Sequence, residues 1–125
     1  MSGIRLSVCI PTYNFGRFIE ETLDSIVRQA PEEVEIVVLD GGSVDNTTEV
    51  VEGFRTTFPR LRYYRQDFKG GIDRDMAKSV ELARGEYCWL FSADDVMAEG
   101  ALDRILRKIR SFKDLSLCGF TRCTI

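Results

Sequence analysis

The segment VEIVVLDGGS, residues 34–43, contains the strongest strand signal in the sequence. Its first part, VEIVVLD, is almost entirely β-branched or apolar, which is typical of a strand buried on both faces of a parallel sheet. The following Gly41, Gly42 and Ser43 favour a turn and end the strand sharply. We therefore predict a buried strand over residues 34–40, with the carboxylate of Asp40 at its carboxyl end.

Strand and helix signals alternate along the rest of the chain. Short apolar runs predict further strands at residues 6–11 and 87–92, and one beginning near residue 115. The more polar segment 61–65 predicts a short strand nearer an edge of the sheet. Helical spacing predicts helices at residues 16–28, 72–83 and around 102–109, and one that Asp45 or Asn46 would cap. This alternation predicts an α/β fold with a mostly parallel sheet flanked by helices. With 125 residues, 44% of them hydrophobic, a single domain over residues 1–125 is expected.

The first predicted helix carries one apolar stripe. Hydrophobic side chains recur there at helical spacing, at Phe15, Phe18, Ile19, Leu23, Ile26 and Val27. We expect this stripe to cover one face of the sheet.

Charge and composition exclude several functional classes. The net charge of −3, without a block of like charges, argues against nucleic acid or an anionic membrane surface as a partner. The absence of histidine excludes His-based catalysis within this chain. No apolar run approaches the roughly 20 residues of a membrane span and no secretory signal is visible, so a cytoplasmic protein is expected. The four cysteines lie in apolar segments without CxxC spacing, which favours reduced core thiols over metal or disulfide use.

Three loops are expected to meet at one edge of the sheet. Residues 11–14, 40–43 and 92–95 each follow the carboxyl end of a predicted strand. In a parallel sheet these ends lie on the same edge, where ligands of such folds bind. If the strand order is doubly wound, the ligand crevice opens between the first and fourth strands.

Two adjacent carboxylates, Asp94 and Asp95, follow the apolar run at residues 87–92. Successive side chains diverge, so one acid can bind a hydroxyl while the other reaches a metal ion. Oxygen ligands select hard cations, and Mg²⁺ or Mn²⁺ held by one or two carboxylates keeps positions open for a diphosphate. The alternative is that both acids simply end a strand in a solvated loop.

Three other side chains have two interpretations each. Asp40 could accept a hydrogen bond from a base or a ribose hydroxyl, or serve only the turn that follows it. Tyr13 could stack on a planar base or pack beneath its own loop. Arg74, near the start of a predicted helix, could meet phosphate charge together with the helix dipole, or lie on a solvated helix face.

Four short blocks occur in the order typical of one enzyme family. They are VCIPTYN at residues 8–14, VLDGGSVDNT at 38–47, GIDRDMAK at 71–78 and ARGEY at 83–87, the last leading to the acid pair. Together they resemble the signature of family 2 glycosyltransferases, which have the GT-A fold, a Rossmann-like α/β architecture. The resemblance covers about residues 6–97 and identifies the chain as the N-terminal nucleotide-sugar-binding part of such an enzyme.

The resemblance implies a role for each matching residue. Those matched to nucleotide binding are Pro11, Thr12, Tyr13, Asn14, Asp40, Arg74 and Asp94. The first loop and Asp40 would surround the base, Arg74 would approach the nucleotide, and Asp94 would lie near the ribose. Asp95 would bind a divalent metal, Mg²⁺ or Mn²⁺, that bridges the diphosphate.

The implied reaction is an inverting transfer of a sugar from a nucleotide-diphosphate donor to a sugar or glycan acceptor, with metal-assisted departure of the nucleoside diphosphate. Polysaccharide synthesis for the cell envelope is the implied setting, where a full-length protein could associate peripherally with the membrane. The family usually has an acid at the position of Ser92, so we expect one carboxylate fewer in the metal site. Because the family's general base follows the fifth strand, we expect it beyond Ile125, and we expect an N-terminal fragment prone to self-association.

Two other classes of protein are compatible with parts of this pattern. A nicotinamide-binding Rossmann domain would need a GxGxxG turn after the first strand, where this chain has PTYNFG at residues 11–16. A non-catalytic nucleotide-binding or protein-interaction module with the same fold remains the alternative to a transferase. Titration with nucleoside diphosphates tests the donor-site prediction directly.

Overall fold

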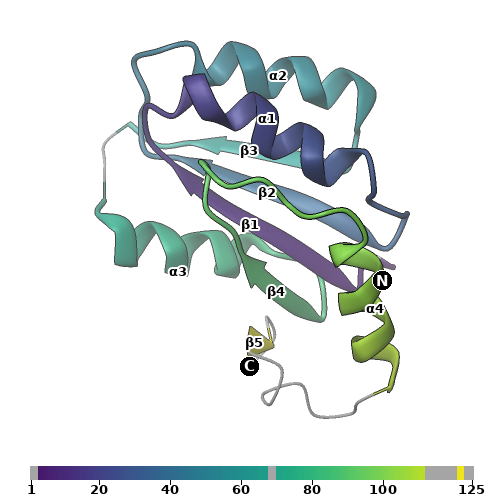
Figure 1. Ribbon diagram of the computed structural model, residues 1–125. Helices are drawn as coiled ribbons and strands as arrows, with labels where there is room; N and C mark the ends of the chain where they lie inside the picture. Colours follow the sequence, from purple (N-terminus) through teal and green to yellow (C-terminus); the bar gives the residue numbers. More distant parts are fainter. Residues whose placement is uncertain (1–2, 68–69, 112–120, 123–125) are drawn as a thin grey trace.

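The computed structural model describes residues 3–67, 70–111 and 121–122, which form one sheet with helices on both faces (Figure 1). The elements occur in the order β1 (Leu6–Thr12), α1 (Gly16–Val27), β2 (Val34–Asp40), α2 (Thr47–Thr57), β3 (Leu61–Arg65), α3 (Ile72–Leu82), β4 (Tyr87–Leu90), α4 (Ala101–Ser111) and β5 (Thr121–Arg122). The strand predicted over residues 34–40 is β2, and all of its residues are buried. The alternation of strands and helices confirms the predicted α/β fold.

The sheet has the strand order β3-β2-β1-β4-β5. β1 pairs in parallel with β2 on one side and β4 on the other, so Leu6 is the register partner of both Val34 and Tyr87. β3 is parallel to β2, whereas the short β5 is antiparallel to β4. The chain builds the sheet from β1 toward β3 and then returns to add β4 on the other side. The direction of building therefore reverses between β1 and β4, as predicted for a doubly wound sheet.

Helices cover both faces of the sheet, with α1 and α2 on one face and α3 on the other (Figure 1). Successive strand residues point to opposite faces, so Val8 and Ile10 of β1 join the larger core, whereas Cys9 joins a smaller cluster with residues of α3. The larger core is completed by apolar side chains from α1, α2 and α4, among them Ile19, Leu23, Ile26, Val51, Leu102, Leu106 and Ile109. The close-packed core thus holds the carboxyl ends of the strands in place.

One member of the predicted apolar stripe of α1 lies outside the core. Phe18 is 44% exposed and contacts Phe15 edge to face, with the ring centroids 6.0 Å apart. The buried face of α1 instead includes Thr22 and Ser25, whose hydroxyls bond to the segment after β4. The prediction for Phe18 is wrong because spacing alone does not show where the buried face ends: that face includes Thr22 and Ser25 and leaves Phe18 outside it.

β4 ends at Leu90, short of the end predicted at Ser92. Phe91 still donates its backbone amide to the Cys9 carbonyl at 2.9 Å, which keeps the chain beside β1 for one further residue. The remainder of the apolar run leaves the sheet and forms the turn that carries the acid pair.

The helices end close to their predicted limits. α1 ends at Val27 where Arg28 was expected, and α3 ends at Leu82 where the pattern extended to Ala83. The strand predicted to begin near residue 115 starts outside the described residues. None of the helices in the described ranges is long and apolar enough to cross a membrane.

A buried carboxylate ties the loop before β4 to the sheet. Glu35, which is 2% exposed, accepts hydrogen bonds from the Ser7 hydroxyl at 2.6 Å and the Arg84 amide at 2.7 Å. It also pairs with Arg62 at 3.0 Å. The Gly85 amide donates to the Ser7 hydroxyl at 2.9 Å, and a Cβ on Gly85 would lie 2.9 Å from the Ser7 backbone nitrogen. The close approach of this loop to β1 therefore requires glycine in the ARGEY block.

Two cysteines test the prediction of reduced core thiols. Cys9 is a free, fully buried thiol, as predicted. Burial, reinforced by the charge of Glu35 and opposed by Arg62, raises the pKa of Cys9 from 9.0 to about 12. Cys88 is disulfide-bonded, so the prediction is wrong for that residue. Disulfide formation depends on distance in the fold, which spacing along the sequence does not reveal.

Candidate functional site

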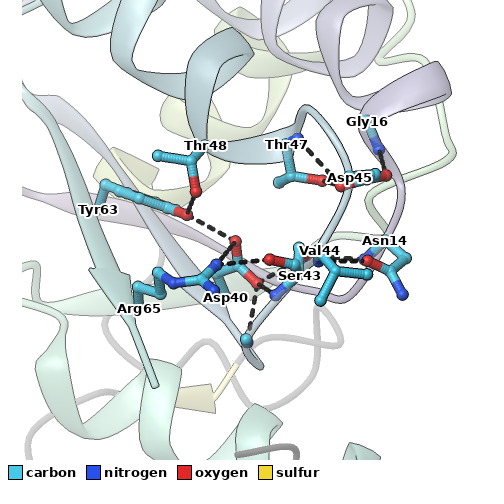
Figure 2. Close-up of polar contacts among 11 residues, drawn as sticks. Asn14, Gly16, Asp40, Ser43, Val44, Asp45, Thr47, Thr48, Tyr63 and Arg65 are labelled. Atoms are coloured by element: carbon cyan, nitrogen blue, oxygen red, sulfur yellow. Dashed lines mark hydrogen bonds and ion pairs between the residues drawn. The ribbon is translucent and has the colours of Figure 1, made fainter. Parts of the chain in front are cut away.

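Asn14 joins the loop after β1 to the loop after β2 (Figure 2). Its backbone amide donates to the Ser43 hydroxyl at 2.8 Å, and its side-chain oxygen accepts the Val44 amide at 2.8 Å. Asn14 has a φ of 57°, a left-handed conformation that asparagine adopts more readily than most residues. We call this pair of bonds the Asn14–Ser43 clasp. It fixes two of the three predicted motif loops relative to each other.

Asp40 is fully buried and organises the turn that follows it. Its Oδ1 accepts hydrogen bonds from the Gly42 amide at 3.0 Å and from the amide and hydroxyl of Ser43 at 2.8 and 2.7 Å. Its Oδ2 accepts the Tyr63 hydroxyl at 2.6 Å. The turn role of Asp40 is thus present in the fold, whereas its contact with a base stays a prediction.

β3 supplies two further residues of this network, Tyr63 and Arg65 (Figure 2). Tyr63 also bonds to the Thr48 hydroxyl at 2.7 Å, and burial together with its bond to Asp40 raises the pKa of Tyr63. Arg65 donates to the Ser43 carbonyl at 2.7 Å and lies 3.8 Å from the Asp40 carboxylate. Neither residue belongs to a motif of the sequence. The strand register, which places Arg65 opposite Asp40 and Tyr63 opposite Val38, is the signal that brings β3 to this turn.

Asp45 bonds to the first turns of two helices. Its Oδ2 accepts the backbone amide of Gly16 at 2.9 Å, and its Oδ1 accepts the Thr47 amide at 3.0 Å and the Thr47 hydroxyl. Burial opposes ionisation of this carboxyl, but the bonds from Thr47 and Gly16 outweigh it and lower the pKa of Asp45. Of the two predicted caps of the second helix, Asp45 supplies the side-chain bonds, whereas Asn46 makes no side-chain cap bond.

The remaining residues of the first loop continue the same edge. Thr12 is the register partner of Asp40, and its carbonyl accepts the Gly41 amide at 2.9 Å. The side chain of Thr12 is 4% exposed, and its hydroxyl has no hydrogen-bond partner within the described ranges. Pro11 and Tyr13 on either side are partly buried. Residues 11–14 and the Asp40 turn therefore lie side by side at this edge of the sheet, while their contact with a nucleotide stays a prediction.

Arg74 lies in the first turn of α3, on the sheet face opposite α1 and α2, and is exposed. Gln66 connects this turn to the same edge. Its backbone amide donates to the Asp40 carbonyl at 2.8 Å, and its side-chain amide donates to Asp75 at 3.0 Å. Asp75 is 5% exposed and follows Arg74 directly. The fold thus brings the helix turn that carries Arg74 next to β2, although no described bond joins Arg74 to the clasp.

Asp94 and Asp95 lie in the turn after β4, and both are exposed. The Ser92 hydroxyl donates a hydrogen bond to Asp94 Oδ1, and the Asp95 amide donates to the Ser92 carbonyl at 3.2 Å. Within the described ranges, nothing donates a hydrogen bond to the Asp95 carboxylate or pairs with it. Ser92, which stands where the family usually has an acid, therefore holds Asp94 and leaves Asp95 accessible to a ligand.

The donor set fits a divalent cation only if a substrate completes it. In the part of the chain that the structure describes, no three His, Cys, Asp or Glu side chains form a cluster that could hold a metal ion. Mg²⁺ is commonly held by one or two carboxylates together with water and substrate phosphates, and Mn²⁺ also accepts oxygen ligands. The accessible carboxylate of Asp95 suits that arrangement, and a closed protein-only cage is not present in the described residues.

The fold and the sequence are both similar to those of known glycosyltransferases. The structure of S. aureus TarS 1–349 in complex with UDP-GlcNAc matches with a TM-score of 0.81 and 29% identity, over 86% of this chain and 32% of that chain. The mannosyltransferase PcManGT from Pyrobaculum calidifontis in complex with GDP-Man and Mn²⁺ matches with a TM-score of 0.75 and 30% identity, over 82% of this chain and 31% of that chain. In sequence, the chain is 38% identical to the abequosyltransferase RfbV of Salmonella typhimurium over 117 residues, 90% of this chain and 35% of that protein.

The chain spans about a third of the length of these relatives. The likeness to TarS confirms the predicted GT-A, Rossmann-like fold. The sequence pattern described as "Glycosyl transferase family 2" matches residues 7–125, almost the whole chain. The direction in which the sheet is built reverses between β1 and β4, and the motif loops lie at its carboxyl edge. Both features agree with this extended match, and the chain belongs to glycosyl transferase family 2.

Proposed function

We propose that this chain provides the donor-binding part of an enzyme that transfers a sugar from a nucleotide diphosphate to a sugar or glycan acceptor. The observation that carries the proposal is the division between the two acids after β4. Asp94 is held by Ser92, whereas Asp95 presents an accessible carboxylate next to the place where the strand order reverses. One fixed and one accessible acid suit a donor that carries both hydroxyl groups and a diphosphate.

We assign the base pocket to residues 11–14 and 40–43. The Asn14–Ser43 clasp fixes these two loops, and Tyr13 between them offers an aromatic ring for stacking. Asp40 would act on this pocket by holding the Ser43 turn, since both of its carboxylate oxygens are engaged inside the protein. Arg74 would meet the nucleotide from the first turn of α3, where the helix dipole adds positive potential.

Asp95 would hold Mg²⁺ or Mn²⁺, and Asp94 would accept a hydrogen bond from the ribose. A divalent cation, when bound, offsets the negative charge of the departing nucleoside diphosphate. Ser92 contributes by keeping Asp94 in place. The chain's own part is thus to bind and orient the donor.

The transfer itself would be inverting and would serve the synthesis of a polysaccharide such as those of the cell envelope. The acceptor hydroxyl would be deprotonated by a carboxylate base, a role that we assign to none of the residues described above. The similar structures were solved with UDP-GlcNAc and with GDP-Man, so UDP and GDP are the nucleotides to test.

Calorimetric titration of the chain with UDP and GDP, with and without Mn²⁺, tests the proposal. We expect one nucleotide to bind, and to bind more tightly with Mn²⁺. Asp95→Ala should remove the Mn²⁺-dependent part of the affinity and leave the fold intact. Glu81→Ala on α3, which also removes an exposed acid, is the matched control and should bind like the parent chain.

Two results would contradict the proposal in different ways. Failure of both nucleotides to bind under every metal condition would remove the donor site from this chain. Unchanged Mn²⁺ dependence in Asp95→Ala would remove only Asp95 from the metal role.

A further inference from the structure

The loop that carries the acid pair rests on polar side chains of α1. After β4 the chain passes along α1 on its way to α4 (Figure 1). The Thr22 hydroxyl donates to the Ala93 carbonyl at 2.9 Å, and the Ser25 hydroxyl accepts the Met97 amide at 2.9 Å. These two bonds lie on either side of Asp94 and Asp95. The acid pair is therefore fixed to α1 at both ends of its loop.

Both bonds are buried. Thr22 and Ser25 are 1% and 4% exposed, and their partners Ala93 and Met97 are 2% and 4% exposed. A buried carbonyl or amide that loses its only partner carries the full cost of its desolvation. The loop thus cannot shift along α1 without leaving buried backbone groups unpaired.

Gln29, just beyond the end of α1, also bonds to the segment that follows the acid pair. Its side-chain amide donates to the Ala98 carbonyl at 3.1 Å, and its side-chain oxygen accepts the Leu102 amide at 3.3 Å. Thr22, Ser25 and Gln29 are spaced by three and four residues, so they follow one side of the helix. This side of α1 specifies where residues 93–102 lie along its length.

Packing alone does not require polar residues here. Ile19, Leu23 and Ile26 of the same helix are fully buried in the core, which shows that an apolar residue is readily accommodated on the inner face of α1. Threonine and serine are also weaker helix formers than alanine or leucine. Their contribution at these positions is directional, because each makes one hydrogen bond to one backbone group of the loop.

α1 also connects the acid pair to the proposed base pocket. Its first residue, Gly16, follows the loop of residues 11–14 and is bonded to Asp45 of the next loop. One rigid helix therefore carries the base pocket at its N-terminus and supports the acid pair further along. The helix therefore fixes the distance between a bound base and the two acids.

We propose that Thr22 and Ser25 are positioning residues that hold Asp94 and Asp95 at the place of the donor's diphosphate. This inference rests on the proposed donor-binding function. Neither residue needs to touch the nucleotide or the metal, because each acts through the backbone of the acid-pair loop.

The test compares Ser25→Ala and Thr22→Val with two controls. Ser79→Ala removes a fully buried serine of α3 whose hydroxyl donates to the Met76 carbonyl at 2.7 Å, much as Ser25 donates to the Thr22 carbonyl at 2.7 Å. Within the described ranges, Ser79 bonds to no loop. Thr22→Ser keeps the hydroxyl and should behave as the parent chain. The first readout is hydrogen exchange of the Met97 amide, which Ser25→Ala should accelerate and Ser79→Ala should leave unchanged.

The second readout is the affinity for UDP and GDP with and without Mn²⁺. Ser25→Ala and Thr22→Val should lower the Mn²⁺-dependent gain in affinity about tenfold, the scale seen when residues that support metal ligands are removed. Affinity without metal should fall less, because only the proposed contact of Asp94 with the ribose then depends on this loop. Thr22→Ser should restore the gain, which a merely structural loss of packing would not.

The outcomes separate this inference from the proposed function. If the parent chain binds neither nucleotide, the proposed function and the inference both fail. If the parent chain binds with Mn²⁺ and the two variants keep its full Mn²⁺ gain, even with faster exchange at Met97, the positioning role alone is overturned. A lost Mn²⁺ gain in both variants, with Ser79→Ala and Thr22→Ser unchanged, supports it.

Discussion

The side-chain oxygen of Asn14 accepts the backbone amide of Val44 at 2.8 Å, and this bond holds together two loops that come from different strands. Asn14 combines this bond with a φ of 57°. Few side chains can both tolerate a left-handed backbone and accept a hydrogen bond so close to it. Asn14 thus provides both the left-handed backbone and the hydrogen-bond acceptor that this edge of the sheet requires, and ligands of this fold bind at that edge.

Replacement of Asn14 should separate these two requirements. Asn14→Ala is expected to lower the free energy of unfolding by about 2 kcal/mol, since it loses the bond to Val44 and strains the left-handed backbone. Asn14→Gly adopts the same backbone without strain and should lose only about 1 kcal/mol. Urea denaturation of both variants gives the comparison. A larger loss for glycine than for alanine would show that backbone strain is not important at this position.

The carboxylate of Asp40 should matter more than any one of its partners. Asp40→Asn is expected to lower the free energy of unfolding by about 3 kcal/mol, because an amide nitrogen would face a hydrogen-bond donor in the Ser43 turn or at Tyr63. Tyr63→Phe removes the bonds of this hydroxyl to Asp40 and Thr48 and should cost about 1–2 kcal/mol. Denaturant titration of both variants measures the two losses. Equal losses would mean that the turn does not depend on the carboxylate.

Thr12 and Thr22 offer a matched pair of buried hydroxyls. Among the described residues the Thr12 hydroxyl has no hydrogen-bond partner, whereas the Thr22 hydroxyl bonds to the Ala93 carbonyl. Thr12→Val should therefore leave the free energy of unfolding unchanged or raise it, because it removes a buried hydroxyl that makes no hydrogen bond to the described residues. Thr22→Val should lower it by about 1–2 kcal/mol, because the Ala93 carbonyl loses its donor. Thermal and urea denaturation distinguish the two. A clear loss for Thr12→Val would indicate that its hydroxyl does have a partner in solution.

The buried thiol of Cys9 predicts a loss of stability at alkaline pH. Its pKa is raised from 9.0 to about 12, chiefly by burial, so the unfolded chain releases this proton at lower pH than the folded chain. The stabilisation is complete below pH 9 and falls as the pH rises toward 12, by about 1.4 kcal/mol per pH unit. Unfolding of the parent chain and of Cys9→Ala, compared from about pH 8 to 11, isolates this contribution. Parallel pH profiles for the two proteins would contradict it.

The strands are largely predictable from the sequence because burial on both faces demands an almost continuous apolar run. β2 follows this rule and matches its predicted limits. Glu35 within it is the exception, and its role depends on Ser7 and Arg62 from the two neighbouring strands. A residue whose partners are set by strand register cannot be interpreted from its own segment.

The sequence predicts where the candidate site lies better than it predicts which hydrogen bonds form there. The end of a strand is visible in one segment, so Asp40, Asp94 and Asp95 are placed at the carboxyl edge from sequence alone. The pattern does not reveal that Asp40 bonds to Tyr63, because that contact requires β3 to lie beside β2.

The helix residues that support the acid pair are hidden for a related reason. Thr22 and Ser25 interrupt the apolar stripe of α1, and a polar residue in a helical pattern normally indicates a solvent-exposed side. Conversely, the same pattern predicts that Phe18 is buried, and it is exposed. Only the position of the loop after β4 explains why hydroxyls are buried on this helix.

With its two carboxylate oxygens, Asp45 bonds to the first residue of α1 and the first residue of α2 (Figure 2). The alignment of both helices therefore depends on the length of one short loop, residues 41–46. A loop exchanged between relatives therefore has to match Asn14 and Gly16, which lie outside it. Asn14 accepts the Val44 amide, Gly16 donates to Asp45, and a Cβ on Gly16 would overlap the Asn46 side-chain oxygen.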